Sequence, residues 1–364
     1  MLAQDEAFAR IRLLRSPNIG PVSYAHLLAR FGTASAAIAA LPDLAGRSGK
    51  PYQIATEERV SKEIANVRKT GARYLFHDSP DYPALLATCE SAPPIVTVRG
   101  EAGRALAPCV AVVGARNASG AAVKLARDFS HAIAEAGFTI VSGLARGIDG
   151  AAHNGALAAG SGATIGVIAS GIDITYPPEH ADLQERVAQE GLLIAEQPPG
   201  TEPLARHFPS RNRIIAGMAA GTLVVEAAPK SGSLITARLA GEYGREVMAI
   251  PGSPLDSRSH GCNQLIRHGA ILVQRPEDVV ELLSGFDGVA RSTFREAAPR
   301  WIDAEVIDES PAEIADLLTL APTGVDELIR QSGDSASAVQ LALLELEIVG
   351  KLQRHAGGRV SLAT

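Results

Sequence analysis

Three segments of the chain combine glycine, a small hydroxyl residue and a cation, as anion-binding loops do. They are VVGARNAS (112–119), VSGLARGID (141–149) and EAAPKSGS (226–233), and each starts at or just after the end of a short apolar run. A strand that ends in such a turn exposes backbone N–H groups, and the N-terminus of a following helix adds positive charge. The pattern predicts a phosphate-binding site, although glycines that merely permit tight turns would explain any one loop alone. The candidate residues are Gly114, Arg116, Ser119, Ser142, Gly143, Arg146, Lys230 and Ser231.

A fourth segment carries cations without acidic neighbours. Residues 203–225 contain no Asp or Glu, yet four basic side chains fall between Arg206 and Arg213. In a chain of net charge −6, such a local cluster suits a polyanion, whereas a surface with dispersed ion pairs is the alternative. Ser210 is the predicted helix N-cap, which would place Arg211 in the first helical turn. The candidates from this segment are Arg206, Arg211, Asn212 and Arg213.

Groups that could carry catalysis are few. Glu226 follows a predicted strand and could serve a nucleotide hydrolase, or it could accept hydrogen bonds from neighbouring loops. Asp149 and His153 are four positions apart, so they would lie on one face of a helix. Catalysis by this pair would need a nucleophile or a metal that the sequence does not show, so a structural role is favoured. The chain has no G-x-G-x-x-G, no G-x-x-x-x-G-K-[ST] and no H-E-x-x-H, and its three cysteines lack metal-ligand spacing. We therefore expect no catalytic residue, no cofactor and no metal.

The loops are positioned by short apolar runs that alternate with helical segments. This alternation predicts an extended, Rossmann-like, doubly wound parallel sheet of the α/β class, buried on both faces. Ligands of such sheets bind where the strands end. Residues 73–100 are expected to add an element at one edge. The predicted strands cover 109–113, 138–141, 163–169, 192–195, 222–225, 247–250 and 270–273.

The domain that contains this sheet is expected at residues 73–285. A chain of 364 residues is long enough for two further, smaller domains, one on each side of it in sequence. Residues 1–72 have net charge +4 and helical spacing around a break at 17–21, which is typical of a SAM-like or helix-hairpin-helix segment. Such a turn could hold a DNA phosphate, or the helices could simply pack. Residues 286–310 lose periodicity and form the predicted linker. Residues 311–364 combine three helices and a small hairpin, which predicts a winged helix.

Composition excludes several classes of protein. With 34 Lys and Arg against 40 Asp and Glu, the chain is not a histone-like binder, and 46% hydrophobic residues exclude extensive disorder. The third helix of the winged helix carries Glu345 and Glu347 and no cation before Lys351, so protein contact or packing is favoured over duplex reading. No signal peptide or membrane span is expected, and the few cysteines favour a reducing, cytoplasmic compartment.

At this point the chain resembles the DNA processing protein A family (DprA, also called Smf). Six segments in one order carry the resemblance, which covers nearly the whole length. They are VVGARNAS, SGLARGIDGAAHNGAL (142–157), ASGIDITYPPEH (169–180), HFPSRNRIIAGM (207–218), EAAPKSGSLITARLA (226–240) and AIPGSPLDSRSHGCNQLIRHGAILV (249–273).

The resemblance implies a non-catalytic homodimer that binds single-stranded DNA, protects it during natural transformation and recombination, and loads the recombinase RecA onto it. A single-strand-binding protein is a further implied partner, and no membrane is involved. Arg116 is the foremost implied DNA contact, and the turn at Ser142 and Gly143 and the HFPSRNR arginines would line the same pocket. Asn263, Leu265 and Leu272 fall in the segment implied in dimer and recombinase contact.

This chain departs from some members of that family at two positions. Pro178 and Ala205 stand where those members carry lysine, and Arg206 could replace the second cation. Two other functions stay open from the residues alone. One is a Rossmann-fold nucleotide-processing hydrolase that uses Glu226, and the other is a winged-helix transcription regulator.

Overall fold

The chain divides into two compact units. The computed structural model describes residues 2–45, 52–285, 311–355 and 357–363. The central unit comprises residues 63–293, and the terminal unit combines residues 1–62 with residues 294–364. The predicted linker, residues 286–310, lies outside the described residues. Each unit has its own hydrophobic core.

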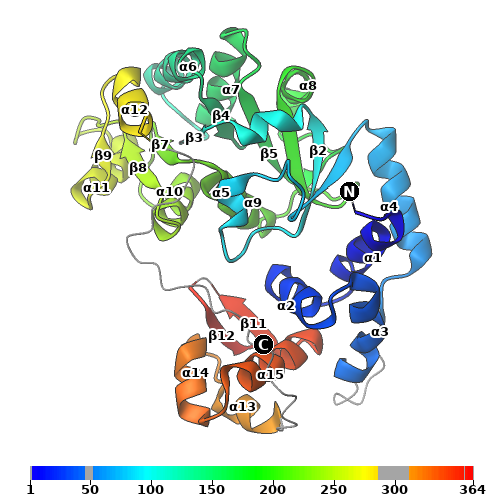
Figure 1. The fold of residues 1–364 in the computed structure, drawn as a ribbon. Coiled ribbons are helices and arrows are strands. Elements are labelled where there is room, and N and C mark those ends of the chain that lie inside the picture. Colours follow the sequence, from blue (N-terminus) through cyan, green and yellow to red (C-terminus); the bar gives the residue numbers. More distant parts are fainter. Residues whose placement is uncertain (1, 46–51, 286–310, 356, 364) are drawn as a thin grey trace. The chain divides into compact units, whose positions relative to one another are not determined.

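The central unit is built on a nine-stranded sheet in the order β1-β2-β6-β5-β4-β3-β7-β8-β9 (Figure 1). The seven strands from β6 to β9 in that order pair in parallel, while β1 and β2 add an antiparallel edge. The doubly wound parallel sheet and its extra edge element are therefore confirmed. The strands are β1 (Arg73–Phe76), β2 (Ile95–Gly100), β3 (Cys109–Val113), β4 (Thr139–Ser142), β5 (Thr164–Gly171), β6 (Leu192–Gln197), β7 (Gly221–Val224), β8 (Glu246–Ala249) and β9 (Ile271–Leu272).

Helices cover both faces of this sheet. Successive side chains of a strand point to opposite faces, and every residue of β3 is apolar, so both faces need to be buried. Val110 and Val112 pack against α6 (Gly120–Glu135), α7 (Ile148–Ala158) and α12 (Pro276–Leu283). Ala111 and Val113 pack in the opposite cluster, with α9 (His207–Met218), α10 (Gly232–Glu242) and α11 (His260–Arg267). The remaining helices are α5 (Ala84–Ala87) and α8 (Ala181–Glu190), with short 3-10 turns at Ala102–Leu106, Pro178–His180 and Ser257–Ser259.

The strand order reverses at β3. From β3 the chain winds outward through β4, β5 and β6, and it then returns to the other side of β3 as β7. The loops after β3 and β7 therefore flank the switch point, the place where open α/β sheets bind their ligands. The loop after β4 lies beside them, because β4 pairs with β3.

The prediction that Ser210 caps the helix of the basic segment is wrong. The N-cap of that helix, α9, is Arg206, four residues before Ser210, and the helix begins at His207. Arg211 therefore lies in the second turn and not in the first, and it is buried. Ile214 and Ile215 are on the buried face of α9. Arg211 precedes them by three and four positions, so it lies on the same face one turn earlier.

The terminal unit contains helices from both parts of the chain and a three-stranded sheet in the order β10-β12-β11. The predicted helical pair around residues 17–21 is present as α1 and α2, and the predicted three helices and hairpin follow residue 310. The elements are α1 (Gln4–Leu14), α2 (Pro21–Phe31), α3 (Ala34–Ala45), α4 (Glu57–Lys69, which continues into the central unit), α13 (Pro311–Leu317), β10 (Thr323–Gly324), α14 (Val325–Ser332), α15 (Ala336–Ile348), β11 (Leu352–His355) and β12 (Arg359–Leu362).

Among the described helices, none is by itself long and apolar enough to cross a membrane. The helices α2 and α3 together reach the required length and hydropathy, and a bend of 105° separates them.

Candidate nucleic-acid interface

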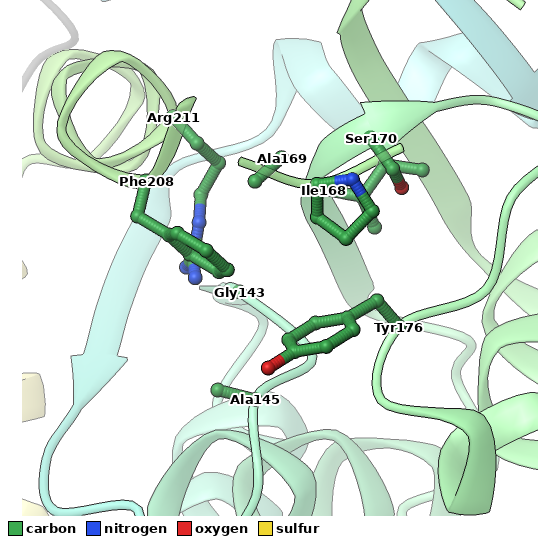
Figure 2. A pocket seen from close by; sticks show the side chains of 9 residues that line it. Gly143, Ala145, Ile168, Ala169, Ser170, Tyr176, Phe208 and Arg211 are labelled. Atoms are coloured by element: carbon green, nitrogen blue, oxygen red, sulfur yellow. The ribbon is translucent and has the colours of Figure 1, made fainter. Parts of the chain in front are cut away.

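A small pocket lies at the carboxyl ends of the parallel strands (Figure 2). Its lining comes from the loop after β4, the end of β5, the segment that follows β5, the segment between β6 and α9, and α9 itself. The structure thus brings Gly143 and Arg211, from two segments that sequence reasoning had assigned to one site, to a common wall. The residues around the pocket are Gly143, Ala145, Ile168, Ala169, Ser170, Tyr176, Pro203, Phe208 and Arg211.

Arg211 forms the buried cationic wall of this pocket. Its side chain is 7% exposed, and its Nη1 lies 3.6 Å from Oδ2 of Asp149, whose side chain is 8% exposed. The same carboxylate accepts hydrogen bonds from the backbone N–H groups of Gly143 (3.2 Å) and Ala145 (3.4 Å). Burial raises the pKa of Asp149 and lowers that of Arg211, and the attraction between the two charges opposes both shifts. Arg211 Nε is buried and has no partner among the described residues.

Gly143 is required for this arrangement. A Cβ atom at that position would lie 1.3 Å from Nη1 of Arg211, so any other side chain would displace the guanidinium. The next turn has a similar constraint at Gly147, where φ is +72° and a Cβ would lie 2.3 Å from the carbonyl oxygen of Ala115. The loops after β3 and β4 therefore pack directly against each other, as their shared edge requires.

Arg116 lies on the solvent side of the pocket. It is exposed, and its guanidinium carbon lies 4.7 Å from the centre of the Phe208 ring. Tyr176, which is 40% exposed, meets the Phe208 ring edge-on, with 5.8 Å between the ring centres. Among the described residues no ion pair involves Arg116, so the alternative pairing with Glu226 does not occur in this structure. A cation beside two aromatic rings fits a strand of phosphates and bases.

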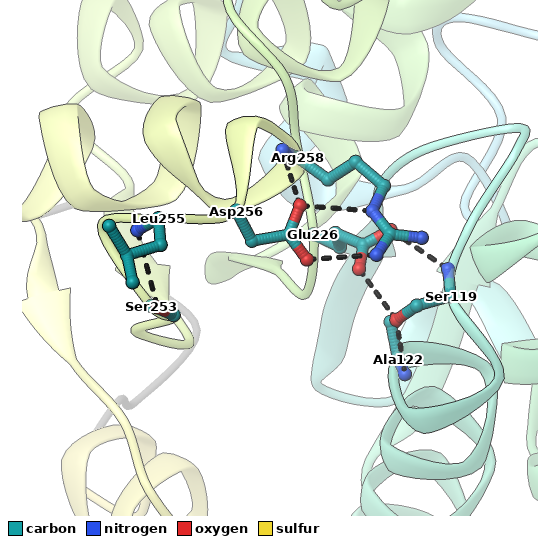
Figure 3. Close-up of polar contacts among 7 residues, drawn as sticks. All are labelled: Ser119, Ala122, Glu226, Ser253, Leu255, Asp256 and Arg258. Atoms are coloured by element: carbon teal, nitrogen blue, oxygen red, sulfur yellow. Dashed lines mark hydrogen bonds and ion pairs between the residues drawn. The ribbon is translucent and has the colours of Figure 1, made fainter.

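Glu226 occupies the N-terminus of α6 (Figure 3). Its carboxylate accepts one hydrogen bond from the backbone N–H of Ser119 (3.0 Å) and another from the Ser119 hydroxyl (2.7 Å). Ser119 Oγ in turn accepts a hydrogen bond from the N–H of Ala122 (3.1 Å), which caps the helix. A carboxylate of the chain thus holds the position at the switch point where an anionic ligand would otherwise meet the helix.

Several predicted site residues are engaged in holding the fold. The hydroxyl of Ser142 donates to the carbonyl of Val112 (2.6 Å) and is fully buried. A Cβ at Gly114 would lie 2.5 Å from the Ile148 side chain. Asn212 donates to the carbonyl of Gly232 (3.3 Å), which joins α9 to α10. Arg213 pairs with Glu196 on β6, and their side chains are 14% and 19% exposed.

The remaining predicted cations are open to solvent. Arg206 and Lys230 are exposed, and Lys230 has a positive φ of +67° in the loop before α10. Arg146 is exposed and pairs with Glu179. Ser231 stands at the N-cap of α10 and its hydroxyl contacts that of Ser233 (2.8 Å). These four residues come from three different segments, since Lys230 and Ser231 are adjacent, and none of them lines the pocket.

Asp149 and His153 share a helix but are not partners. His153 Nδ1 contacts the hydroxyl of Thr164 (2.8 Å), and burial lowers the pKa of His153 to about 3. These contacts agree with the structural role expected for the two residues. Asp149 pairs with Arg211 and accepts a hydrogen bond from the loop after β4.

The predicted partner surface lies at the far end of the sheet. Asn263 holds the loop after β8, because its side chain exchanges hydrogen bonds with both N and O of Gly252 (3.1 and 2.9 Å). Leu265 packs partly against the core, while Leu272 on the edge strand β9 is 45% exposed. In the same loop Asp256 binds Arg258 through three hydrogen bonds, beside Leu255, which is 95% exposed (Figure 3).

Sequence reasoning missed the aromatic part of the site. Phe208 and Tyr176 both lie in segments that carry the family resemblance, yet neither was among the candidates. An aromatic residue inside a basic segment is a signal for stacking with bases and would have identified Phe208. Glu196 and Glu179, which neutralise Arg213 and Arg146, come from distant segments and left no comparable signal.

Comparison with known families gives three consecutive matches. Residues 73–284 match the family described as DNA recombination-mediator protein A. Residues 4–66 match the DprA-like N-terminal HHH domain, and residues 297–358 match the DprA winged helix domain.

Individual relatives agree with this. Protein Smf of Escherichia coli is 35% identical over 347 residues, which cover 94% of this chain and 91% of the relative. DNA processing protein DprA of Streptococcus pneumoniae is 46% identical over 199 residues, covering 55% of this chain and 70% of the relative.

Two solved structures are also similar. The X-ray structure of DprA from S. pneumoniae has a TM-score of 0.66 at 36% identity, covering 77% of this chain and 98% of the other. The structure of DNA processing protein A from Helicobacter pylori, reported for its single-stranded DNA binding mode, has a TM-score of 0.52 at 26% identity, with 58% and 95% covered. With matches across the central, N-terminal and C-terminal segments, the chain belongs to the DNA recombination-mediator protein A (DprA/Smf) family.

Proposed function

We propose that this chain binds single-stranded DNA at the rim formed by the loops after β3, β4 and β6. The observation that supports this most is that two arginines lie close to Phe208. Arg116 is exposed and lies over the Phe208 ring, and Arg211 is buried and lines the same pocket as Phe208. The H. pylori relative is described as binding single-stranded DNA, which agrees with the proposal. Duplex DNA is the weaker ligand, because the third helix of the winged helix is acidic and apolar.

The chemistry assigned to each group follows from its exposure. Arg116 binds a backbone phosphate, since it is exposed and has no carboxylate partner among the described residues. Phe208 and Tyr176 give stacking surfaces that tolerate any base, so sequence preference is small. Arg206 and Lys230 extend the positive surface along which the strand passes, and Arg146 joins them where a phosphate replaces its partner Glu179. Ser231 adds a hydroxyl at the start of α10.

We also propose that the chain is not an enzyme. The hydrolase alternative relies on Glu226, whose carboxylate is already bound to the N–H and hydroxyl of Ser119. That residue also fills the helix N-terminus that a nucleotide phosphate would need. His153 is fully buried with its pKa lowered to about 3, so it is a poor proton carrier near neutral pH.

The cellular role forms part of the same proposal. We infer that the bound strand is protected and passed to RecA during natural transformation and recombination, with a single-strand-binding protein as a further partner. Family membership supports this role. A homodimer through the β9 edge is proposed because Ile271 and Leu272 leave 36% and 45% of their surface exposed on an edge strand. A cytoplasmic location accords with three free, buried cysteines.

The test is a titration of oligo-dT, a matched duplex and a mononucleotide, followed by fluorescence anisotropy or competition. We expect oligo-dT to bind most tightly. Arg116→Ala should weaken oligo-dT binding roughly 10- to 100-fold, because a charge-assisted contact contributes about 1.5–3 kcal/mol. The slope of log K against log salt should fall by about 0.7.

The matched control is Arg238→Ala. Arg238 is an exposed arginine of α10 that pairs with Glu242 one turn away, and its removal should leave both DNA affinity and salt slope unchanged. The thermal midpoint of Arg116→Ala should also stay within about a degree of the parent, since Arg116 is exposed and forms no ion pair with a described residue. Equal affinity for blunt duplex, or an unchanged salt slope with a lowered midpoint, contradicts the proposal.

A further inference from the structure

The turn between α1 and α2 has its polar groups engaged within the protein. A turn between two helices binds a phosphate through backbone N–H groups that face outward. Here the N–H of Gly20 donates to Ser23 Oγ (2.9 Å), and the N–H of Ile19 donates to the carbonyl of Ser16 (3.4 Å). The Tyr52 hydroxyl donates to the carbonyl of Pro17. These amides are therefore not presented to an incoming anion.

The same turn caps a helix of the winged helix. Asn18 adopts a positive φ of +61°, and its side-chain Nδ2 donates to the carbonyl of Ile348 (3.0 Å), the last residue of α15. The final carbonyls of a helix lack partners inside the helix, so a donor from another segment stabilises that end. Gly350, with φ of +76°, follows; a Cβ there would lie 3.1 Å from Asn18 Nδ2. Close contact at this point depends on both residues.

Apolar side chains extend the contact along α15. Leu344 and Ile348 are 2% and 0% exposed, and they belong to the hydrophobic cluster of α1, α2 and α3, together with Leu27. Leu343 and Leu346, on the other side of α15, belong to the separate core of the winged helix. The helix is therefore buried on two sides by two different domains of the terminal unit.

An ion pair lies at the same contact between the turn and α15. Glu347 accepts a hydrogen bond from Nε of Arg354 on β11 (2.8 Å), and the two side chains are 14% and 17% exposed. A Cβ at Gly20 would lie 3.8 Å from Oε1 of Glu347, which is ordinary van der Waals contact. Charge, apolar packing and a helix cap thus coincide where the turn meets α15.

We propose that the turn at residues 17–21 is a docking element for the winged helix of this chain and not a phosphate-binding hairpin. The helices before residue 46 and the winged helix then behave as one module. The module keeps the C-terminal half of α15 out of a DNA groove, because that half and its end are already covered. This inference does not depend on the DNA site proposed for the central unit.

Reciprocal hydrogen exchange on the full chain tests the docking. Asn18→Ala should accelerate exchange of the Val349, Gly350 and Lys351 amides about 5- to 10-fold, since it removes the hydrogen bond to the Ile348 carbonyl that holds this end of α15. Ile348→Val, a mild truncation, should accelerate exchange of the Tyr24 amide by about 3- to 10-fold. Gln353→Ala, an exposed change on β11, should alter neither segment. Effects confined to the mutated domain, or no effect at all, would overturn the docking.

A second variant separates docking from phosphate binding. Gly20→Ala adds a methyl group that the docked structure accommodates, since φ is −93° at Gly20 and the nearest atom lies 3.8 Å away. In a phosphate-binding turn the same methyl group would obstruct the close approach of the anion. We expect oligo-dT and duplex affinities within twofold of the parent. A fall of fivefold or more in either affinity would show that the turn binds DNA, and it would overturn the inference while leaving the Arg116 test intact.

Discussion

At the scale of single residues, the pocket depends on Gly143 and Asp149, six positions apart in sequence, and on Arg211, which comes from a distant segment. Arg211 can reach the loop after β4 only because position 143 has no side chain, and Asp149 keeps the guanidinium there. Burying a charge is costly unless a partner of opposite charge lies close. The three residues are therefore expected to respond to substitution as a unit.

Changing Gly143 to Ala should disrupt this unit. The new Cβ would overlap Nη1 of Arg211, so the arginine must leave and Asp149 loses its partner. Breaking a buried pair in this way costs about 3–5 kcal/mol of unfolding free energy, and urea denaturation measures it. Oligo-dT affinity should fall as well. Gly120→Ala is the control, because nothing lies within 4 Å of its Cβ position. A Gly143→Ala protein as stable as this control would contradict the assignment.

His153 gives stability a defined dependence on pH. Burial lowers its pKa from 6.5 to about 3, so below pH 6.5 the unfolded chain binds a proton that the folded chain does not. Stability from this residue is therefore fully present above pH 6.5 and is lost progressively as pH falls toward 3. At pH 5 the expected loss is about 2 kcal/mol. Urea unfolding gives the unfolding free energy of the parent and of His153→Gln at each pH. Between pH 6.5 and 5 this free energy should fall more steeply with decreasing pH in the parent than in the variant. The same fall in both proteins would exclude His153 as the source.

At the scale of elements, α6 is anchored by an anion from a neighbouring loop. Ser119 caps the helix while Glu226 binds Ser119, so the strand pair β3 and β7 is tied together at the switch point. The arrangement gives the helix N-terminus the negative charge that its dipole favours.

Replacing Glu226 with Gln should weaken this anchor. The substitution keeps the shape but removes the charge, and we expect a loss of about 1–2 kcal/mol in unfolding free energy from the helix dipole and the charged hydrogen bonds. Oligo-dT affinity should stay within about threefold. Chemical denaturation and anisotropy on one sample give both values. A large loss of DNA affinity without a loss of stability would place Glu226 in the binding site instead.

The fold could be predicted at the level of elements because its signals are local. Short apolar runs such as Cys109–Val113 that end in glycine predict buried parallel strands, and all seven predicted runs correspond to strands. The site was less predictable, because it depends on which partner each charge finds. Arg211 and Arg213 look alike in sequence, but one lines the pocket and the other is held by Glu196. Such pairings arise between segments that only tertiary structure brings together.

At the scale of the whole molecule, the two edges of the large sheet differ. One ends in the antiparallel pair β1 and β2, and the other ends in the two-residue strand β9. Short edge strands limit aggregation, but exposed apolar residues on such an edge are suited to a specific partner. Leu272 stands at this edge, with the loop that carries Leu255 nearby in the chain.

The Leu272→Arg variant tests the proposed dimer. A charge at the centre of an apolar contact cannot be desolvated cheaply, so the measured mass should fall from that of a dimer to that of a monomer. Light scattering with size-exclusion chromatography gives the mass directly. Because Leu272 is exposed in the single chain, thermal stability at low concentration should hardly change. A dimer that persists unchanged in the variant would rule out this edge.

The hydrogen bond from Asn18 to Ile348 joins residues 330 positions apart in sequence. During synthesis, the helices before residue 46 leave the ribosome long before α15 exists. Their apolar side chains, Leu27 among them, cannot complete their core until residues 336–348 have been made. Chains released early would keep that surface uncovered and be open to chaperones and proteases. A chain that ends before α15 therefore lacks two of the apolar side chains of this cluster, Leu344 and Ile348.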